Sequence, residues 1–266
     1  MYNLFYKLRK SPFSLNPDPD FLYLSPKHKN ALAVLERSLA NWVGLSAITG
    51  EKGTGKSTLI RYLLKQSWPD VTFGLVSESD TPPVGLLKRT LSAFGLNSFG
   101  KTTSESYDLL SDFMVIDCFW KKRQPVLIID ESIGMESRAL EELYMLSTIE
   151  PEKNRKLRII LVMPPSLWET LKRPTWSHLA RRVGNSYQLE TLNYQETVAY
   201  VQHRLRVAGA QNESLFDDPA CKAIFRYSGG NPRLINVLCN AAPVSYTHLT
   251  LPTTIEVWWG GGGGGG

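Results

Sequence analysis

The sequence contains few cysteines and no long apolar run. Its three cysteines, Cys118, Cys221 and Cys239, are scattered and form no C-x-x-C pair. This pattern indicates neither a disulfide framework nor a zinc site, and it favours a reducing compartment. No stretch approaches the roughly 18 apolar residues of a membrane span, and residues 1–10 lack the apolar core of a signal peptide. These absences predict a cytoplasmic location.

The overall composition is that of an ordinary globular protein. The chain has 266 residues, of which 42% are hydrophobic and 21% are charged. This length predicts one large domain, or one domain with a smaller one attached. The net charge of +5 and the pI near 9.0 permit contact with nucleic acid or acidic lipid but do not require it.

The most informative stretch is a glycine-rich loop that fits the pattern G-x-x-x-x-G-K-[ST]. A strand-like run at residues 43–48 precedes the loop, and residues 58–65 follow it with helical periodicity. A chance glycine turn would not need this context, whereas a phosphate-binding loop does. We predict that the nucleotide-binding residues are Gly50, Glu51, Lys52, Gly53, Thr54, Gly55, Lys56, Ser57 and Thr58.

The residue types of this loop suit ATP with bound Mg²⁺. Glycine lets the backbone curl with its N–H groups inward, and it lets phosphate oxygens approach because it has no Cβ. The positive end of the following helix adds to the attraction. Lys56 is predicted to reach the β- and γ-phosphates as a catalytic residue, and the Ser57 hydroxyl to hold Mg²⁺.

A second motif is an apolar run, residues 125–129, that ends in two carboxylates, Asp130 and Glu131. A run buried on both faces is typical of a central parallel strand, and open α/β sheets bind ligands at the carboxyl ends of their strands. We predict that Asp130 holds Mg²⁺ through water and that Glu131 is the catalytic general base that polarises the attacking water. The alternative is an ordinary strand followed by an acidic helix cap.

The order of the expected elements indicates the fold. Strand-like and helical runs alternate up to a last strand at 186–190, which predicts a three-layer α/β sandwich on a mostly parallel sheet. With the phosphate loop, this is the expected fold of a P-loop NTPase. Helices from Asn193 onward predict a small α-helical lid. The expected domains are 1–191 and 192–242. Residues 243–266 end in a glycine run and are expected to be a non-native or disordered tail. If the tail is non-native, the natural chain is expected to continue past about Ala242; the alternative is a genuine flexible tail.

The proline-rich segment at residues 11–26 is expected to be ordered but irregular. Its aromatic residues Phe13, Phe21 and Tyr23 leave two interpretations open. In the first, they pack near the adenine of a bound nucleotide. In the second, which the spacing alone favours, they fasten the N-terminal segment to the core.

Together these motifs resemble a known family. From about Tyr2 to Asn240, the chain resembles the ATPase domain of general secretion pathway protein A and its relatives, a branch of the AAA+ ATPases. An early and a late segment are more specific to this family than the phosphate loop is. They are Pro12-Phe13 with Pro17-Asp18-Pro19 and residues 21–26 (Phe-Leu-Tyr-Leu-Ser-Pro), and residues 227–239 (Tyr-Ser-Gly-Gly-Asn-Pro-Arg-Leu-Ile-Asn-Val-Leu-Cys).

The resemblance implies roles for two arginines. Arg233 matches the sensor-2 arginine of the lid, which touches the γ-phosphate and couples lid closure to nucleotide state. Arg182 matches an arginine that relatives keep at Leu-Ala-x-Arg, and it is a candidate finger toward the nucleotide of a neighbouring subunit. The adjacent Arg181 could exchange roles with it, and both could instead form a solvated basic pair. A homo-oligomer, from dimer to hexamer, follows from this resemblance.

Two departures from the family pattern concern hydrolysis. Relatives read Asp-Glu-Ala-Gln after the acidic strand, where this chain has Ser132 and Ile133 after the two carboxylates. Relatives also end the next strand with Gly-Gln-Pro, whose glutamine is the expected sensor 1, where this chain has Met163-Pro164-Pro165. Proline cannot donate a hydrogen bond to a γ-phosphate or to a water. We therefore expect nucleotide binding with slow turnover, unless Ser166 or Ser132 substitutes.

The resemblance implies an ATPase that drives or switches assembly of a bacterial secretion or pilus apparatus. Envelope proteins would be its partners, and it would lie at the cytoplasmic face of the inner membrane if the natural chain continues into a span. One alternative is a nucleic-acid-dependent ATPase of the transposition-helper type, although no recognition helix or aromatic–basic array favours DNA here. The other is a nucleotide-binding scaffold with weak hydrolysis.

Overall fold

The computed structural model describes residues 8–41, 43–77, 85–130, 135, 137–150, 156–210 and 215–241. The chain forms two compact units. Unit 1 comprises Met1–Ser25, Gly53–Thr58 and Thr191–Gly266, and unit 2 comprises Pro26–Lys52 and Leu59–Glu190.

Unit 2 is built on a five-stranded sheet with the strand order β2-β3-β4-β1-β5. Each pair of neighbouring strands is parallel. Nearly continuous apolar runs form β3 and β4, as expected for parallel strands covered on both faces. β1 (Leu-Ser-Ala-Ile-Thr) is also buried along its whole length. The strands are β1 (Leu45–Thr49), β2 (Val71–Ser77), β3 (Gln124–Asp130), β4 (Arg158–Met163) and β5 (Val183–Gln188).

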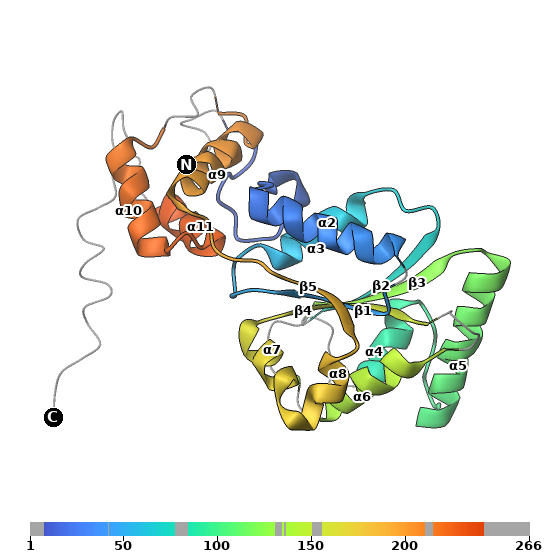
Figure 1. The fold of residues 1–266 in the computed structure, drawn as a ribbon. Coiled ribbons are helices and arrows are strands. Elements are labelled where there is room, and N and C mark those ends of the chain that lie inside the picture. The colour runs from blue at the N-terminus through green and yellow to red at the C-terminus, as the bar shows by residue number, and fades with distance from the viewer. Residues whose placement is uncertain are drawn as a thin grey trace. The chain divides into compact units, whose positions relative to one another are not determined.

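Helices cover both faces of this sheet, which confirms the predicted three-layer sandwich (Figure 1). One face carries α2 (Pro26–Ala40) and α3 (Lys56–Lys65). The other face carries α4 (Leu86–Ala93), α5 (Thr103–Val115), α6 (Ser137–Thr148), α7 (Pro165–Lys172) and α8 (Ser177–Ala180). Two short elements, the π-helix η2 (Ile116–Trp120) and the 3₁₀-helix η3 (Pro174–Trp176), follow α5 and α7.

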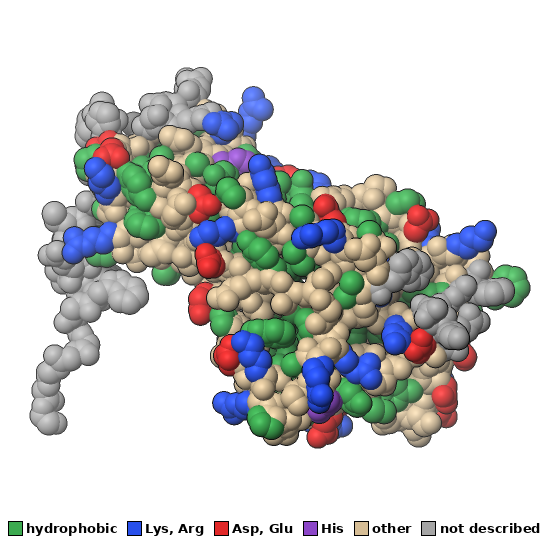
Figure 2. Space-filling view, in the orientation of Figure 1, with side chains coloured by type: hydrophobic (Ala, Val, Ile, Leu, Met, Phe, Trp, Pro, Cys, Tyr) green, Lys and Arg blue, Asp and Glu red, His purple; other side chains and the backbone are tan. Residues whose placement is uncertain are grey.

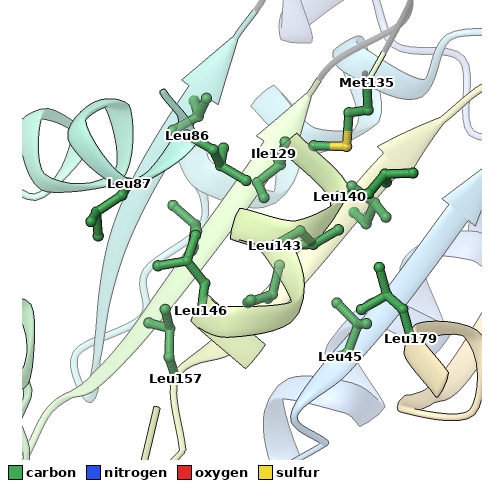
Figure 3. Packing of buried hydrophobic residues seen from close by; sticks show 14 of the residues in the cluster. Leu45, Leu86, Leu87, Ile129, Met135, Leu140, Leu143, Leu146, Leu157 and Leu179 are labelled. Carbon is green, nitrogen blue, oxygen red and sulfur yellow. The ribbon is translucent and has the colours of Figure 1, made fainter. Parts of the chain in front are cut away.

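The main apolar core of unit 2 lies between the sheet and the second helical layer. Because side chains alternate along a strand, Leu127 and Ile129 of β3 point into this core. Figure 3 shows the leucines that α4, α6 and α8 contribute around Ile129 and Leu45. These are Leu86, Leu87, Leu140, Leu143, Leu146 and Leu179.

Unit 1 has a core of its own, made largely by the C-terminal helices. The helices are α9 (Tyr194–Val207), α10 (Asp218–Ser228) and α11 (Pro232–Ala241). Their buried residues include Val201, Leu205, Ile224 and Ile235. The N-terminal segment, with the 3₁₀-helix η1 (Pro19–Phe21), belongs to the same unit.

A buried arginine of α9 fastens the N-terminal segment. Arg204 is 5% exposed, and its guanidinium donates hydrogen bonds to the carbonyls of Pro12 and Ser14. It also lies 4.5 Å from the centroid of the Phe21 ring, and Phe13 packs edge-on against Phe216 at 5.9 Å. Phe13 and Phe21 therefore pack the N-terminal segment against helices of unit 1, as the second interpretation expects for these two aromatics.

The last strand begins three residues earlier than the sequence pattern predicts. β5 starts at Val183, and residues 189 and 190 lie beyond it. Val183, Gly184 and Asn185 lack an apolar alternation, but Val183 pairs with Leu45 and Asn185 with Ser46, so that Gly184 is an extra residue at a register shift. A Cβ at Gly184 would lie 2.8 Å from the Val43 Cγ1, so the Val43 side chain would have to move.

Charged side chains of both signs are interspersed over the face seen in Figure 2. The net charge of +5 therefore does not gather into one broad basic surface on that face. Within the described residues, no helix combines the length and the apolar character that a membrane span requires.

Candidate functional site

The glycine-rich loop leaves β1 at the carboxyl edge of the sheet and leads into α3. The N–H of Gly50 donates to the carbonyl of Met163, the last residue of β4, over 3.2 Å. Thr49 lies opposite Met163 in the β1–β4 pairing. The bond from Gly50 extends this pairing by one residue. The start of the loop is thus fixed by the sheet, in the strand–loop–helix context that the sequence predicts.

Two glycines give the loop a backbone that other residues rarely adopt. Gly53 has φ of 91° and Gly55 has φ of 100°, both in the left-handed region that favours glycine. A Cβ at Gly53 would lie 2.5 Å from the Asn231 Oδ1 and 2.7 Å from the Arg233 Cβ. Gly53 is therefore required both by its conformation and by the close approach of the chain near Arg233.

Arg233 is held beside the loop by its backbone. Its N–H donates to the carbonyl of Gly53 over 3.2 Å, and its side chain is exposed. The structure thus brings the predicted sensor-2 arginine and the phosphate loop together within unit 1. A cationic side chain at this position suits an anionic ligand.

Asn231 is a site residue for which the sequence analysis assigns no role. Its Oδ1 accepts from the N–H groups of Arg233 and Leu234, at 3.0 and 3.4 Å, so it caps the N-terminus of α11. The signal is present in the sequence, because asparagine followed by proline is a strong helix start. By fixing the first turn of α11 against Gly53, Asn231 positions Arg233.

The two ends of the loop differ in exposure. Glu51 and Lys52 are exposed, whereas Thr54 and Lys56 are buried, at 0% and 6% exposure. Lys56 is the first residue of α3, and Ser57 and Thr58 follow it in the first turn, both half-buried. Burial lowers the dielectric around the Lys56 ammonium and so strengthens its attraction for an anion.

Asp130 is the last residue of β3 and lies at the same sheet edge as the start of the loop. It pairs with Val162 of β4, and Met163, the next residue along, pairs with Thr49 of β1. With β4 alone between them, the ends of β1 and β3 place Gly50 and the half-buried Asp130 on neighbouring parts of this edge. Glu131 lies outside the described residues.

The turn after β4 contains two prolines, Pro164 and Pro165. Pro164 precedes α7, and its carbonyl accepts from the N–H groups of Leu167 and Trp168. Pro165 is the first residue of the helix and Ser166 the second. Neither proline has an N–H to donate at this edge.

Arg182 makes two contacts within unit 2. Its guanidinium donates to the carbonyl of Ser147 in the last turn of α6, over 3.3 Å, and lies 5.2 Å from the centroid of the Tyr144 ring. The neighbouring Arg181 donates to the carbonyl of Ser177 over 3.3 Å. Both arginines are exposed, and Arg182 also stabilises the C-terminus of α6, where a positive charge is favourable.

Comparison with known proteins agrees with this geometry. A family model described as an AAA domain matches residues 43–171. General secretion pathway protein A of Aeromonas hydrophila is 34% identical over 247 residues, which are 92% of this chain and 45% of that protein. The chain therefore spans less than half the length of this relative.

Solved structures share the fold at low sequence identity. The ORC2 protein of Aeropyrum pernix, in ADPNP and ADP complexes, has a TM-score of 0.62 and 16% identity, covering 87% of this chain and 64% of that one. Cdc6p of Pyrobaculum aerophilum has a TM-score of 0.59 and 14% identity, covering 87% and 68%. At such identities the likeness concerns the fold alone. Residues 43–171 thus match an AAA domain, most of the chain is similar to general secretion pathway protein A, as its motifs predict, and the fold is the one these solved structures share.

Proposed function

We propose that this chain binds Mg²⁺-ATP in the loop 50–58 and hydrolyses it slowly. The observation that carries the proposal is the conformation of the loop: Gly53 and Gly55 are left-handed, with φ of 91° and 100°. They stand between a buried parallel strand and the N-terminus of α3. Such a loop directs backbone N–H groups toward an anion. The similarity to an AAA family supports a nucleotide as that anion.

The proposed roles follow from the chemistry of each side chain. Lys56 attracts the β- and γ-phosphates, and Arg233, fixed beside Gly53, attracts the γ-phosphate. The Ser57 hydroxyl and the Asp130 carboxylate supply oxygen atoms, which Mg²⁺ prefers. When bound, Mg²⁺ offsets the negative charge of the phosphate oxygens. Glu131 accepts a proton from the attacking water as general base.

ATP turnover by the full chain tests this proposal. Lys56→Ala is expected to abolish both binding and turnover, whereas Glu131→Gln, which keeps the shape of the side chain, retains binding and loses turnover by roughly 100-fold or more. Pro164→Gln is expected to raise turnover, because it restores a side-chain donor after β4. Binding is measured with a fluorescent ATP analogue, and turnover by phosphate release.

Lys65→Ala is the matched control for Lys56→Ala, because Lys65 is the exposed last residue of the same helix, α3, and lies outside the loop. It is expected to retain ATP binding within a few-fold. A wild-type chain that binds no nucleotide refutes the proposal as a whole. A wild-type chain that binds ATP but turns it over no faster than Glu131→Gln refutes the hydrolytic part.

A chain that binds ATP without turning it over would be a nucleotide-binding scaffold, and one observation favours this alternative. Pro164 stands where the family has a glutamine, and its carbonyl is already engaged by the first turn of α7. A scaffold would switch between nucleotide-free and ATP-bound states without turnover. In that case Pro164→Gln would leave turnover at the level of Glu131→Gln.

We further propose that the chain acts as a homo-oligomer in assembly of a secretion or pilus apparatus. The support is the name of its relative, general secretion pathway protein A, together with the AAA family. A need for ATP is consistent with a cytoplasmic location. Co-purification of tagged and untagged copies with and without ATP tests self-association, and capture of envelope proteins from the host cell tests the partner class.

A further inference from the structure

The turn between α5 and β3 exposes apolar and basic side chains together. Trp120 is 75% exposed and Ile116 is 48% exposed. They are four residues apart in the π-helix η2, so they lie on one side of it. Lys121, Lys122 and Arg123 follow directly, and all three are exposed. We call Ile116, Trp120 and Lys121–Arg123 the basic tip.

The basic tip is held in shape by its own backbone and by one buried carboxylate. Asp117 is 1% exposed, and its Oδ1 lies 3.0 Å from the Lys121 Nζ. The Asp117 carbonyl accepts from the N–H of Arg123 over 2.9 Å. Lys122 has φ of 53°, in the left-handed region, which turns the chain sharply into β3. A partner would therefore meet a preorganised surface, and little conformational entropy would be lost on binding.

We propose that the basic tip binds the surface of a membrane that contains anionic lipids. An indole ring prefers the headgroup level of a bilayer, and basic side chains are attracted to the negative charge of acidic lipids. Lys121 is partly neutralised by Asp117, but Lys122 and Arg123 add two further positive charges. Ile116 favours lipid over nucleic acid, because an aliphatic side chain has no aromatic face on which a base could stack.

The position of the basic tip fits this role. It precedes Gln124, the first residue of β3, whereas Asp130 ends the same strand at the carboxyl edge. Membrane contact at the amino end of β3 leaves the carboxyl edge, where the phosphate loop begins, open to ligands. Membrane binding by the basic tip therefore does not depend on nucleotide hydrolysis.

Vesicle binding by the full chain tests the proposal. Vesicles of phosphatidylcholine with phosphatidylglycerol are expected to bind the chain more tightly than vesicles of phosphatidylcholine alone. Lys122→Gln with Arg123→Gln is expected to weaken binding to the anionic vesicles by about tenfold or more, given the contribution of each basic residue near such a surface. Ile116→Ser with Trp120→Ser is expected to weaken it to a similar extent.

The matched control lies near the start of α5. Phe99 is 94% exposed and Lys101 is exposed, so Phe99→Ser with Lys101→Gln removes an equivalent aromatic and charge elsewhere. This variant is expected to bind anionic vesicles within twofold of wild type. An equal loss in the control, or equal wild-type binding to neutral and anionic vesicles, overturns the proposal.

A spectroscopic readout covers the case in which the serine variants unfold. Brominated lipid should quench part of the tryptophan fluorescence of the wild type, and Trp120→Phe should lose that part while it still binds vesicles. If quenching is unchanged in Trp120→Phe, Trp120 does not enter the membrane and the proposal fails. If the tip variants lose binding to a DNA oligonucleotide but keep vesicle binding, the tip is a nucleic-acid site and the proposal is wrong.

Discussion

Two adjacent glycines of unit 1 show how differently a single Cβ is tolerated. Gly229 ends α10 with φ of 56°, and a Cβ there would meet nothing within 4 Å. Gly230 has φ of 73°, and a Cβ there would lie 1.8 Å from the carbonyl oxygen of Leu192. The backbones of these two residues also bond, because the Leu192 N–H donates to the Gly230 carbonyl over 2.9 Å.

We expect Gly230→Ala to destabilise the protein by about 3 kcal/mol or more, because the left-handed conformation and the forced backbone shift both contribute. Gly229→Ala should cost about 1 kcal/mol, from the left-handed conformation alone. Urea unfolding of the two variants beside wild type measures the difference. Equal losses of stability would show that the close approach of Gly230 to Leu192 does not exist in solution.

The residue scale also shows what the sequence could predict about the site. The spacing of Gly50, Lys56 and Asp130 predicts the loop and the acidic strand end, because each residue type has a chemical reason to stand where it does. The Asn-Pro pair at 231–232 predicts a helix start, but the closeness of Asn231 to Gly53 joins residues far apart in the sequence, and no local pattern predicts it. Arg204 is similar: a charged residue is normally exposed, and its burial depends on carbonyls about 190 positions earlier.

Among the elements, α9 and the N-terminal segment are joined partly through a histidine. The ring of His203 lies 5.7 Å from that of Tyr23, and its Nε2 is buried without a hydrogen-bond partner among the described residues. Burial lowers the pKa of His203, and the charges of Arg206 and Arg204 lower it further, against a hydrogen bond with the Leu22 backbone that raises it. The folded protein therefore favours the neutral imidazole.

This arrangement predicts a loss of stability in mild acid. The unfolded chain has a histidine pKa of about 6.5, whereas the folded pKa is lower, so the unfolded state binds more protons as the pH falls through this range. Stability is then highest above about pH 6.5 and decreases below it. Urea midpoints at pH 7.5 and 5.5 should differ for wild type, and the difference should be smaller for His203→Gln. An unchanged difference in His203→Gln would assign the effect to other groups.

The sequence predicts which helices and strands exist better than it predicts where each of them begins and ends. The buried strands β1 and β3 begin and end within one or two residues of the predicted runs at 43–48 and 125–129. The start of β5 is not predicted, because Val183–Asn185 enter the sheet with an extra residue, Gly184, at a register shift against β1. The π-helix η2 has no recognised sequence pattern, since it depends on how α5 ends before β3.

For the whole molecule, two roles of Arg182 have to be separated: one within its own subunit and one at the nucleotide of a neighbouring subunit. Its contacts with Tyr144 and the Ser147 carbonyl give it a stabilising role within unit 2. A trans role requires that the guanidinium leave these contacts in an oligomer. Loss of turnover in Arg182→Ala alone cannot separate the two roles, because a weakened α6 could also lower activity.

Mixing two inactive variants separates them. Glu131→Gln subunits keep Arg182 but lack the base, and Arg182→Ala subunits keep the base but lack the arginine. If Arg182 acts in trans, about one site in four of an equal mixture pairs an intact base with a neighbour's arginine, so turnover rises above that of either variant alone. If Arg182 acts within its own subunit, the mixture shows the average of the two. The mixture is then repeated with Arg181→Ala in place of Arg182→Ala. Turnover above that of either variant alone is expected only for the arginine that reaches the neighbour, and not for an arginine that stabilises its own helix.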